Sequence, residues 1–279
     1  MIADNKPMIA RHNVVRLLVL AMLGASVILA AALSPGPARA DTQDEAQLGA
    51  QLFSQLKAQR EIVKSSPLYD TLAPIAAAIT KAVQPKYRYP IHFYIVHEAQ
   101  PNAFAAPGGN IYVVDSLFYF VHNTEELAGT ICHETSHLLH HDSVELMKKN
   151  EAIRARAIAA TVLLGPSVKT VLAISAIAQL DSNHYSRSAE EQADLTGSDT
   201  CAAAGYNPWG LVWLMNDFEN SNLREPPEIL SDHPNDAHRI QALERHFKAD
   251  PSVFARFSND SHTAKPLSPP SDESENFLR

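Results

Sequence analysis

Apolar residues recur with helical spacing along much of the chain. In residues 42–63 and 68–83 they follow one another at intervals of three or four, which predicts two amphipathic helices. Helical character returns in the second half of the chain, in residues 143–181, 184–204, 208–220 and 236–249. Because this pattern covers most of the sequence, we expect a mainly helical fold.

A different pattern lies between the second and third of these helical regions. Residues 92–96 and 111–114 are rich in β-branched and aromatic side chains, which predicts two strands, and residues 104–106 predict a short edge strand. Residues 107–110, Pro-Gly-Gly-Asn, have the composition of a turn. The expected fold class is therefore α+β, mainly helical, with a small antiparallel sheet that comes just before the next helix.

The helix after the predicted sheet contains the sequence His133-Glu134-Thr135-Ser136-His137. Residues four apart share one face of a helix, so the two imidazoles can bind one Zn²⁺. Glu134 can then reach a water molecule on that metal, which is the arrangement of a zinc peptidase. The alternative is a helix whose histidines only cap or pack, because a chain with 13 histidines can contain this spacing by chance.

A hydrolytic zinc site usually has three protein ligands and leaves one position for water. The predicted helix 184–204 offers Glu190 and Asp194, which are four residues apart and share a face. One carboxylate can bind the metal while the other orients a ligand histidine. Glu191 points about 100° away and is the poorer candidate. Taken alone, these acids also fit an ordinary solvated helix face.

The N-terminal region has the features of an export signal. Arg11 and Arg16 give a basic start, residues 14–33 are almost wholly apolar, and Ala38-Arg39-Ala40 fits the signal-peptidase pattern. Cleavage after Ala40 predicts a periplasmic protein, and an uncleaved inner-membrane anchor is the alternative. Residues 1–40 contain four basic and one acidic residue, so their removal changes the formal net charge from −8 to −11. This charge disfavours nucleic-acid binding.

The chain has only two cysteines, Cys132 and Cys201, too few for a disulfide framework. Export to an oxidising compartment allows them to pair, whereas two buried free thiols are the alternative. The sequence leaves this open, because pairing depends on the separation of the two Cα atoms.

Two further segments have unusual composition. Residues 157–180 are strongly apolar, which fits either a core helical hairpin or a segment in peripheral contact with a membrane. Gly165-Pro166 and Lys169 within it argue against a complete membrane span. Residues 258–279 are rich in proline, serine and acidic residues and are expected to be disordered.

Four sequence blocks follow one another in a distinctive order. The blocks are Asn102-Ala103-Phe104-Ala105-Ala106-Pro107-Gly108-Gly109-Asn110-Ile111-Tyr112-Val113, His133-Glu134-x-x-His137, Ser186-Arg187-x-x-Glu190-x-x-Ala193-Asp194 and His233-Pro234-x-x-x-x-Arg239-Ile240. This order resembles that of one enzyme family, the M48 metallopeptidases, and the resemblance covers about residues 68–247. The group contains the HtpX-type membrane proteases, the CAAX prenyl proteases and the periplasmic BepA-type proteases.

The resemblance implies a gluzincin-type peptidase domain over residues 41–257 that binds one Zn²⁺ per chain. By the family pattern, the metal ligands are His133, His137 and Glu190, and Asp194 orients a ligand histidine. Glu134 is the catalytic glutamate. His233 lies beside the metal, where it either caps the zinc or stabilises the oxyanion. The strand bordering the substrate cleft supplies Asn102, Ala103, Phe104 and Ala105.

The function implied is that of a periplasmic zinc endopeptidase, without the repeat domain of the BepA type. Its substrates are expected to be exported envelope proteins that are misfolded or misassembled. A chaperone or adaptor with a capped zinc, and a metal-stabilised structural domain, are the alternatives. The chain departs from the family at Ser136, where glycine or alanine is common, and at His141 and Asp142, where Arg-His is frequent. His140 and His141 are expected at the surface. These departures bear on substrate preference more than on chemistry.

Overall fold

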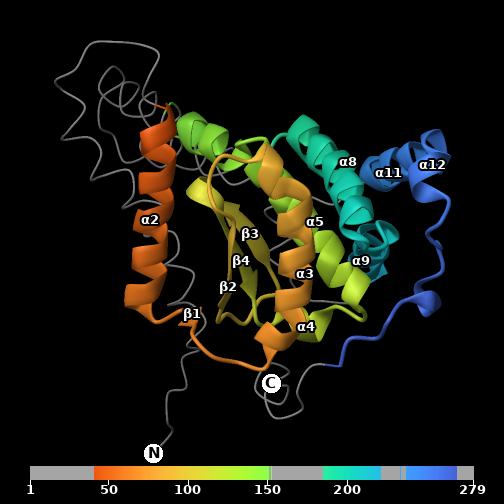
Figure 1. Ribbon diagram of the computed structural model, residues 1–279, viewed down its shortest axis with the longest axis horizontal. Coiled ribbons are helices and arrows are strands. Elements are labelled where there is room, and N and C mark those ends of the chain that lie inside the picture. Colours follow the sequence, from red (N-terminus) through yellow and green to blue (C-terminus); the bar gives the residue numbers. More distant parts are fainter. Residues whose placement is uncertain (1–40, 151, 153–184, 221–232, 234–236, 269–279) are drawn as a thin grey trace, which may run out of the picture. The chain divides into compact units, whose positions relative to one another are not determined.

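The computed structural model describes residues 41–150, 152, 185–220, 233 and 237–268. From Gln43 onward these residues belong to one compact unit (Figure 1). The predicted signal peptide, residues 1–40, and the apolar stretch 157–180 lie outside the described residues.

Helices make up most of the described chain, which confirms the mainly helical α+β prediction. Figure 1 shows α2, α3 and α5 around a small sheet, with α8, α9 and α11 following in the second half of the sequence. The α-helices are α2 Asp41–Gln59, α3 Leu68–Val83, α4 Leu117–Phe120, α5 Thr124–Leu139, α8 Arg187–Ala204, α9 Trp209–Asn220, α11 Ala237–Ala249 and α12 Pro251–Phe254. The 3₁₀ helices are η1 Gln84–Lys86, η2 Pro107–Gly109 and η3 Ser261–Thr263.

The sheet has four strands in the order β1-β2-β4-β3, and it is mixed. The strands are β1 Ile62–Val63, β2 His92–Val96, β3 Ala103–Ala106 and β4 Asn110–Val114. The β2 and β4 strands run parallel, whereas β3 pairs with β4 in the antiparallel direction. The prediction of an antiparallel sheet is therefore wrong for the central pair. The chain reverses twice, into β3 and out of it, so β4 regains the direction of β2.

The two glycines of the β3–β4 turn are required by the backbone. Gly108 and Gly109 have φ angles of 79° and 100°, a region that residues with a β-carbon rarely adopt. A β-carbon on Gly109 would also lie 2.1 Å from the carbonyl oxygen of Pro90. The turn predicted from residues 107–110 is confirmed, and it sets β3 at the edge of the sheet.

The two faces of the sheet pack against different helices. Along β4, Ile111 and Val113 face a core shared with α3 and α5, because alternate residues of a strand point to opposite sides. Tyr112 and Val114 face a smaller cluster with Leu56 of α2. Since all five β4 residues are buried, the strand is fixed between two helical layers and holds β3 beside α5.

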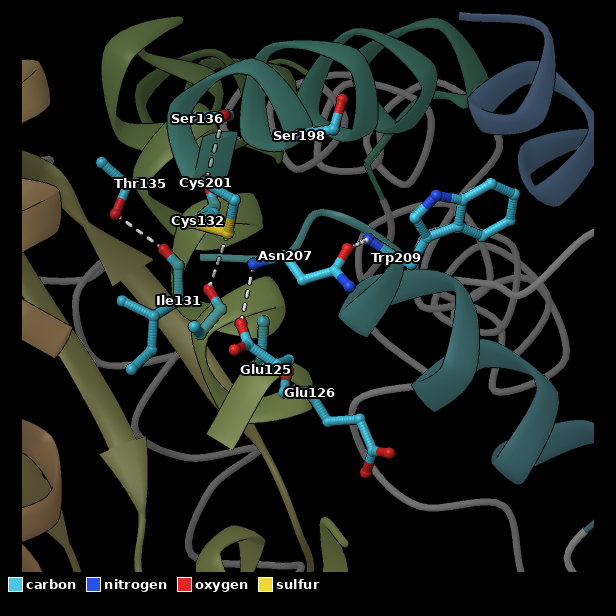
Figure 2. The surroundings of a disulfide bond; sticks show 12 residues. Glu125, Glu126, Ile131, Cys132, Thr135, Ser136, Ser198, Cys201, Asn207 and Trp209 are labelled. Atoms are coloured by element: carbon cyan, nitrogen blue, oxygen red, sulfur yellow. Dashed lines mark hydrogen bonds between the residues drawn. A yellow bond between two sulfur atoms is a disulfide. The ribbon is translucent and has the colours of Figure 1, made fainter. Parts of the chain in front are cut away.

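Helices α5 and α8 pack very closely, and a disulfide between Cys132 and Cys201 joins them (Figure 2). The Cα atoms of the two cysteines are 5.7 Å apart, within the usual range for a disulfide. A β-carbon on Gly197 would lie 3.1 Å from the Cα atom of His133, so glycine permits the close approach. The pairing that the sequence left open is present in the structure.

In residues 258–268, the first part of the tail predicted to be disordered, Lys265 and Leu267 hydrogen-bond to the start of α5 and the residue before its cap. The amide of Thr124 donates to the carbonyl of Lys265 at 3.1 Å, and the amide of Leu267 donates to the carbonyl of His122 at 3.0 Å. The remaining tail, 269–279, lies outside the described residues. None of the helices in the described ranges has the length and hydrophobicity needed to cross a membrane.

Candidate active site

The α5 helix presents the two histidines of the His-Glu-x-x-His sequence side by side. Asn123 caps its start, where the side-chain oxygen accepts a hydrogen bond from the amide of Glu126 at 3.0 Å. His133 and His137 lie one turn apart, and their Nε2 atoms are 3.0 Å from each other. Both side chains are buried. Two imidazole nitrogens therefore converge on one point, as the sequence predicts.

The α8 helix brings a carboxylate to the same point. Ser186 caps this helix, and Glu190 follows in the first turn. The carboxylate oxygens of Glu190 lie 3.4 Å from Nε2 of His133 and 3.5 Å from Nε2 of His137. Tetrahedral zinc, with bonds of about 2.0–2.1 Å, holds its ligand atoms about 3.3 Å apart. These donors therefore have the chemistry and the spacing of a three-ligand zinc site.

Asp194, one turn further along α8, faces the other side of His133. Its Oδ1 atom is 3.0 Å from Nδ1 of His133. Both carboxylate oxygens also accept hydrogen bonds from the buried guanidinium of Arg239 on α11, at 2.7 and 2.8 Å. Arg239 extends to Glu190, with Nη1 2.8 Å from Oε2. Glu190 thus lies beside the Nε2 atoms of both histidines, whereas Asp194 lies beside Nδ1 of His133.

The electrostatics of this cluster favour positive charge at its centre. Burial lowers the pKa of His133, but hydrogen bonds with Asp194 and Glu190 outweigh burial and raise it to about 10. Burial likewise raises the pKa of Glu190, yet the charge of His233 and hydrogen bonds from the histidines hold it well below its usual range. A divalent cation supplies the same positive charge and leaves the imidazoles free to bind as neutral ligands.

The side chains of His133, His137, Glu190 and His233 are together called the donor cluster. Glu134 lies fully buried between this cluster and the sheet. Its Oε2 atom accepts a hydrogen bond from the amide of Ala105 at 2.9 Å. Its Oε1 atom makes no hydrogen bond within the described part of the chain and lies 3.3 Å from Nε2 of His233. One carboxylate oxygen is thus fixed by β3, and the other is available to a water molecule at the donor cluster.

His233 completes the group of buried donors. Its Nδ1 atom is 2.8 Å from Oε1 of Glu190 and 3.3 Å from Nε2 of His133. One ring nitrogen thus faces the donors that could bind a metal, and the other faces Glu134. His133, His137, Glu190 and His233 together form a group of side chains that could hold one metal ion.

The predicted substrate strand, β3, is divided between two faces. Ala105 directs its amide to Glu134 and its carbonyl to Oγ of Ser143, at 2.8 Å, so its outer edge faces the donor cluster. Phe104 points to the α2 side, where it stacks on Tyr112 with ring centroids 4.9 Å apart. The Asn102 side chain accepts a hydrogen bond from the amide of Ala103. Of the four predicted residues, Ala105 is the one hydrogen-bonded to Glu134.

The sequence profile described as Peptidase family M48 matches residues 70–246, more than half of the chain. The chain belongs to peptidase family M48. The matched range contains every residue of the donor cluster.

Characterised relatives of this M48 peptidase include proteases of two kinds. It is 28% identical over 159 residues to the beta-barrel assembly-enhancing protease of Yersinia pestis, covering 53% of this chain and 32% of the relative. It is 21% identical over 231 residues to the Escherichia coli K12 protein of the same name, covering 79% of this chain and 47% of the relative. It is 28% identical over 169 residues to the mitochondrial metalloendopeptidase OMA1 of Saccharomyces cerevisiae, covering 57% of this chain and 47% of the relative. The chain spans less than half the length of these relatives.

Three side chains of the M48 site were not assigned a role from the sequence. Arg239 lies in a matched block, but its contacts to Glu190 and Asp194 depend on where α11 packs. Tyr185 stacks on His137, with ring centroids 4.1 Å apart. Asp142 lies 2.7 Å from Nδ1 of His137. In contrast, His140 and His141 lie outside the donor cluster, as expected, and contact Thr196 and Glu45.

Proposed function

We propose that this chain is a zinc-dependent endopeptidase that hydrolyses exported envelope proteins when they are misfolded or misassembled. One observation carries the proposal: the ligand atoms of His133, His137 and Glu190 converge beside a buried Glu134 oxygen to which no residue of the described ranges hydrogen-bonds. We assign one Zn²⁺ per chain to these three residues, because two imidazoles and a carboxylate in this spacing suit zinc.

The proposed reaction follows from the positions of the chain's own side chains. When bound, Zn²⁺ lowers the pKa of a water molecule and polarises the scissile carbonyl. Oε1 of Glu134 accepts the proton of that water and returns a proton to the leaving amine. Nε2 of His233 donates a hydrogen bond to the oxygen on which negative charge develops. Asp194 and Arg239 hold His133 and Glu190 in place from behind.

The edge of β3 is the proposed binding site for the substrate backbone. The amide of Ala105 is bonded to Glu134, so an extended peptide can hydrogen-bond to the Ala105 carbonyl by a main-chain contact, and selectivity for sequence is loose. That carbonyl also accepts a hydrogen bond from Ser143, and its second lone pair can accept one from a peptide amide. This mode of binding suits unfolded chains, since a folded protein seldom offers a free extended strand.

We infer a periplasmic location after cleavage behind Ala40. The composition of residues 1–40 and the Cys132–Cys201 disulfide both support export to an oxidising compartment. The names of the bacterial relatives connect them with β-barrel assembly, which supports envelope proteins as the substrate class. Peripheral membrane contact through residues 157–180 is part of the proposal, whereas nucleic-acid binding is not, given the net charge of the mature chain.

Removal of zinc is expected to abolish cleavage of an unfolded protein such as casein, and added Zn²⁺ to restore it. Metal analysis of the purified chain should give one zinc per polypeptide. Because zinc binds the folded site, it also stabilises the fold, by about 4 kcal/mol at a free concentration a thousand times its Kd. Undiminished proteolysis after complete removal of metal would contradict the proposal. A chain that binds casein and zinc without cleaving would instead support the chaperone alternative.

Replacement of His233 by alanine is expected to lower turnover about 10²-fold, because a hydrogen-bond donor to the developing oxyanion is lost. Steady-state cleavage of a fluorogenic peptide by the zinc-loaded variant measures this effect, with His246→Ala as the control at a histidine of α11 outside the donor cluster. A rise in turnover would identify His233 as a cap on the metal, and an unchanged rate would remove both roles.

A further inference from the structure

Each of the two α5 histidines directs its second ring nitrogen at a different carboxylate. Nδ1 of His133 lies 3.0 Å from Asp194, and Nδ1 of His137 lies 2.7 Å from Oδ2 of Asp142. A metal-binding histidine that donates its other N–H to a carboxylate has its tautomer and ring orientation fixed. Asp194 belongs to the family pattern, whereas Asp142 is one of the departures from it. Both histidines nevertheless have a carboxylate within 3.0 Å of the second ring nitrogen, and the contact of His137 with Asp142 is the one that has hydrogen-bond geometry in the described residues.

The backbone after α5 is shaped so that Asp142 can reach His137. In a continuous helix, a residue five positions later lies about 140° around the axis, and its side chain would point away. The α5 helix ends at Leu139, His141 has the left-handed φ angle of 58°, and residues 142–150 are again helical. The break re-aims residue 142, and its carboxylate returns to the ring of His137.

A left-handed histidine persists only where its surroundings fix it. Glu45 of α2 supplies that restraint, because both of its carboxylate oxygens lie 3.1 Å from Nδ1 of His141. Glu45 is itself buried and accepts a hydrogen bond from the hydroxyl of Tyr87 at 3.0 Å. The side chain of His141 is about half exposed, so these contacts, and not burial alone, determine where it lies.

We infer that Asp142 is a positioning residue for His137, and that α2 holds the 140–142 turn in place through the Glu45–His141 contact. The inference rests on the zinc site proposed above. It extends the support of that site from α8 and α11 to α2, a helix that supplies none of the donor atoms.

Zinc affinity tests the inference, measured on the full exported chain by competition with a chelator of known affinity. We expect Asp142→Ala to weaken zinc binding about 10–100-fold, the usual effect of losing such a partner. Asp142→Asn keeps an acceptor oxygen but loses the charge, and should lie between wild type and Asp142→Ala. Glu45→Gln should weaken binding by less than Asp142→Ala. The visible spectrum of bound Co²⁺ should change in Asp142→Ala, because the His137 ring is no longer fixed.

A matched control is available on the surface of the same chain. Asp199 pairs with His246 at 2.8 Å, between α8 and α11 and outside the donor cluster. Asp199→Ala removes the same kind of contact and should leave zinc affinity and the Co²⁺ spectrum unchanged. A loss of affinity in Asp199→Ala equal to that in Asp142→Ala would overturn the positioning role.

The remaining outcomes separate this inference from the proposed function. If wild type binds zinc and folded Asp142→Ala and Asp142→Asn bind it equally tightly, the positioning role is overturned while the peptidase proposal stands. If Glu45→Gln binds zinc as tightly as wild type, the part that concerns α2 is overturned. If the wild-type chain binds no zinc, the proposed function fails, and this inference fails with it. Far-UV circular dichroism of each variant confirms that the comparison is made between folded proteins.

Discussion

The Glu134→Gln variant is expected to retain zinc and to lose peptidase activity, with kcat about 10²–10⁴-fold lower. Glutamine has nearly the same shape and can still accept the hydrogen bond from the amide of Ala105, so the site should keep its geometry. It cannot take a proton from water. Because Glu134 contributes no atom to the proposed ligand set, zinc content should stay at that of wild type.

Cleavage of casein and metal content, measured on the same samples, check this prediction. Glu191→Gln is the matched control, since it makes the same change beside Glu190 on an exposed position of α8. Activity of Glu134→Gln equal to that of wild type would remove the general-base role. A simultaneous loss of zinc would show that Glu134 contributes to metal binding, which the structure does not predict.

The parts of the fold set by local sequence could be predicted, and those set by long-range packing could not. The α5 helix was predictable because the spacing of His133 and His137 lies within one helix. The positions of β2, β3 and β4 were also predictable from composition, whereas β1, Ile62–Val63, lies in a region predicted to be helical. The pairing of β2 with β4 was not predictable, because it depends on β3 lying on the outer side of β4 and not between β2 and β4.

The same division applies to the donor cluster. Helical spacing alone left Glu190 and Asp194 equivalent, and the family resemblance favoured Glu190; their distances from His133 and His137 now separate them. The contact of Asp142 with His137 had no signal in helical periodicity, since it exists only because the helix breaks at His141. Asp142, which departs from the family pattern, thus contacts one of the proposed metal ligands.

Loss of the Cys132–Cys201 disulfide is expected to lower the free energy of unfolding by about 4 kcal/mol. The two cysteines are separated by 69 residues, and a crosslink that closes a long loop restricts the unfolded chain strongly. Urea unfolding of the wild type, with and without a phosphine reductant that does not compete for zinc, measures the effect. The midpoint should fall when the bond is reduced.

The double variant Cys132→Ala/Cys201→Ala provides the control, because reductant should not shift its midpoint. Equal midpoints for the oxidised wild type, the reduced wild type and the double variant would show that the crosslink contributes nothing to stability.

The disulfide should matter less for the donor cluster than for the stability of the whole domain. Cys132 precedes His133 directly, and Cys201 lies on the helix that carries Glu190, so the bond ties together the two helices that provide the proposed ligands (Figure 2). These helices are also held together by close backbone packing at Gly197 and by the contact of Asp194 on α8 with His133 on α5. We therefore expect the reduced enzyme, at a temperature where it remains folded, to keep its zinc and most of its activity. A reduced protein that is folded but has lost its zinc would show that the crosslink, and not this packing, sets the distance between α5 and α8.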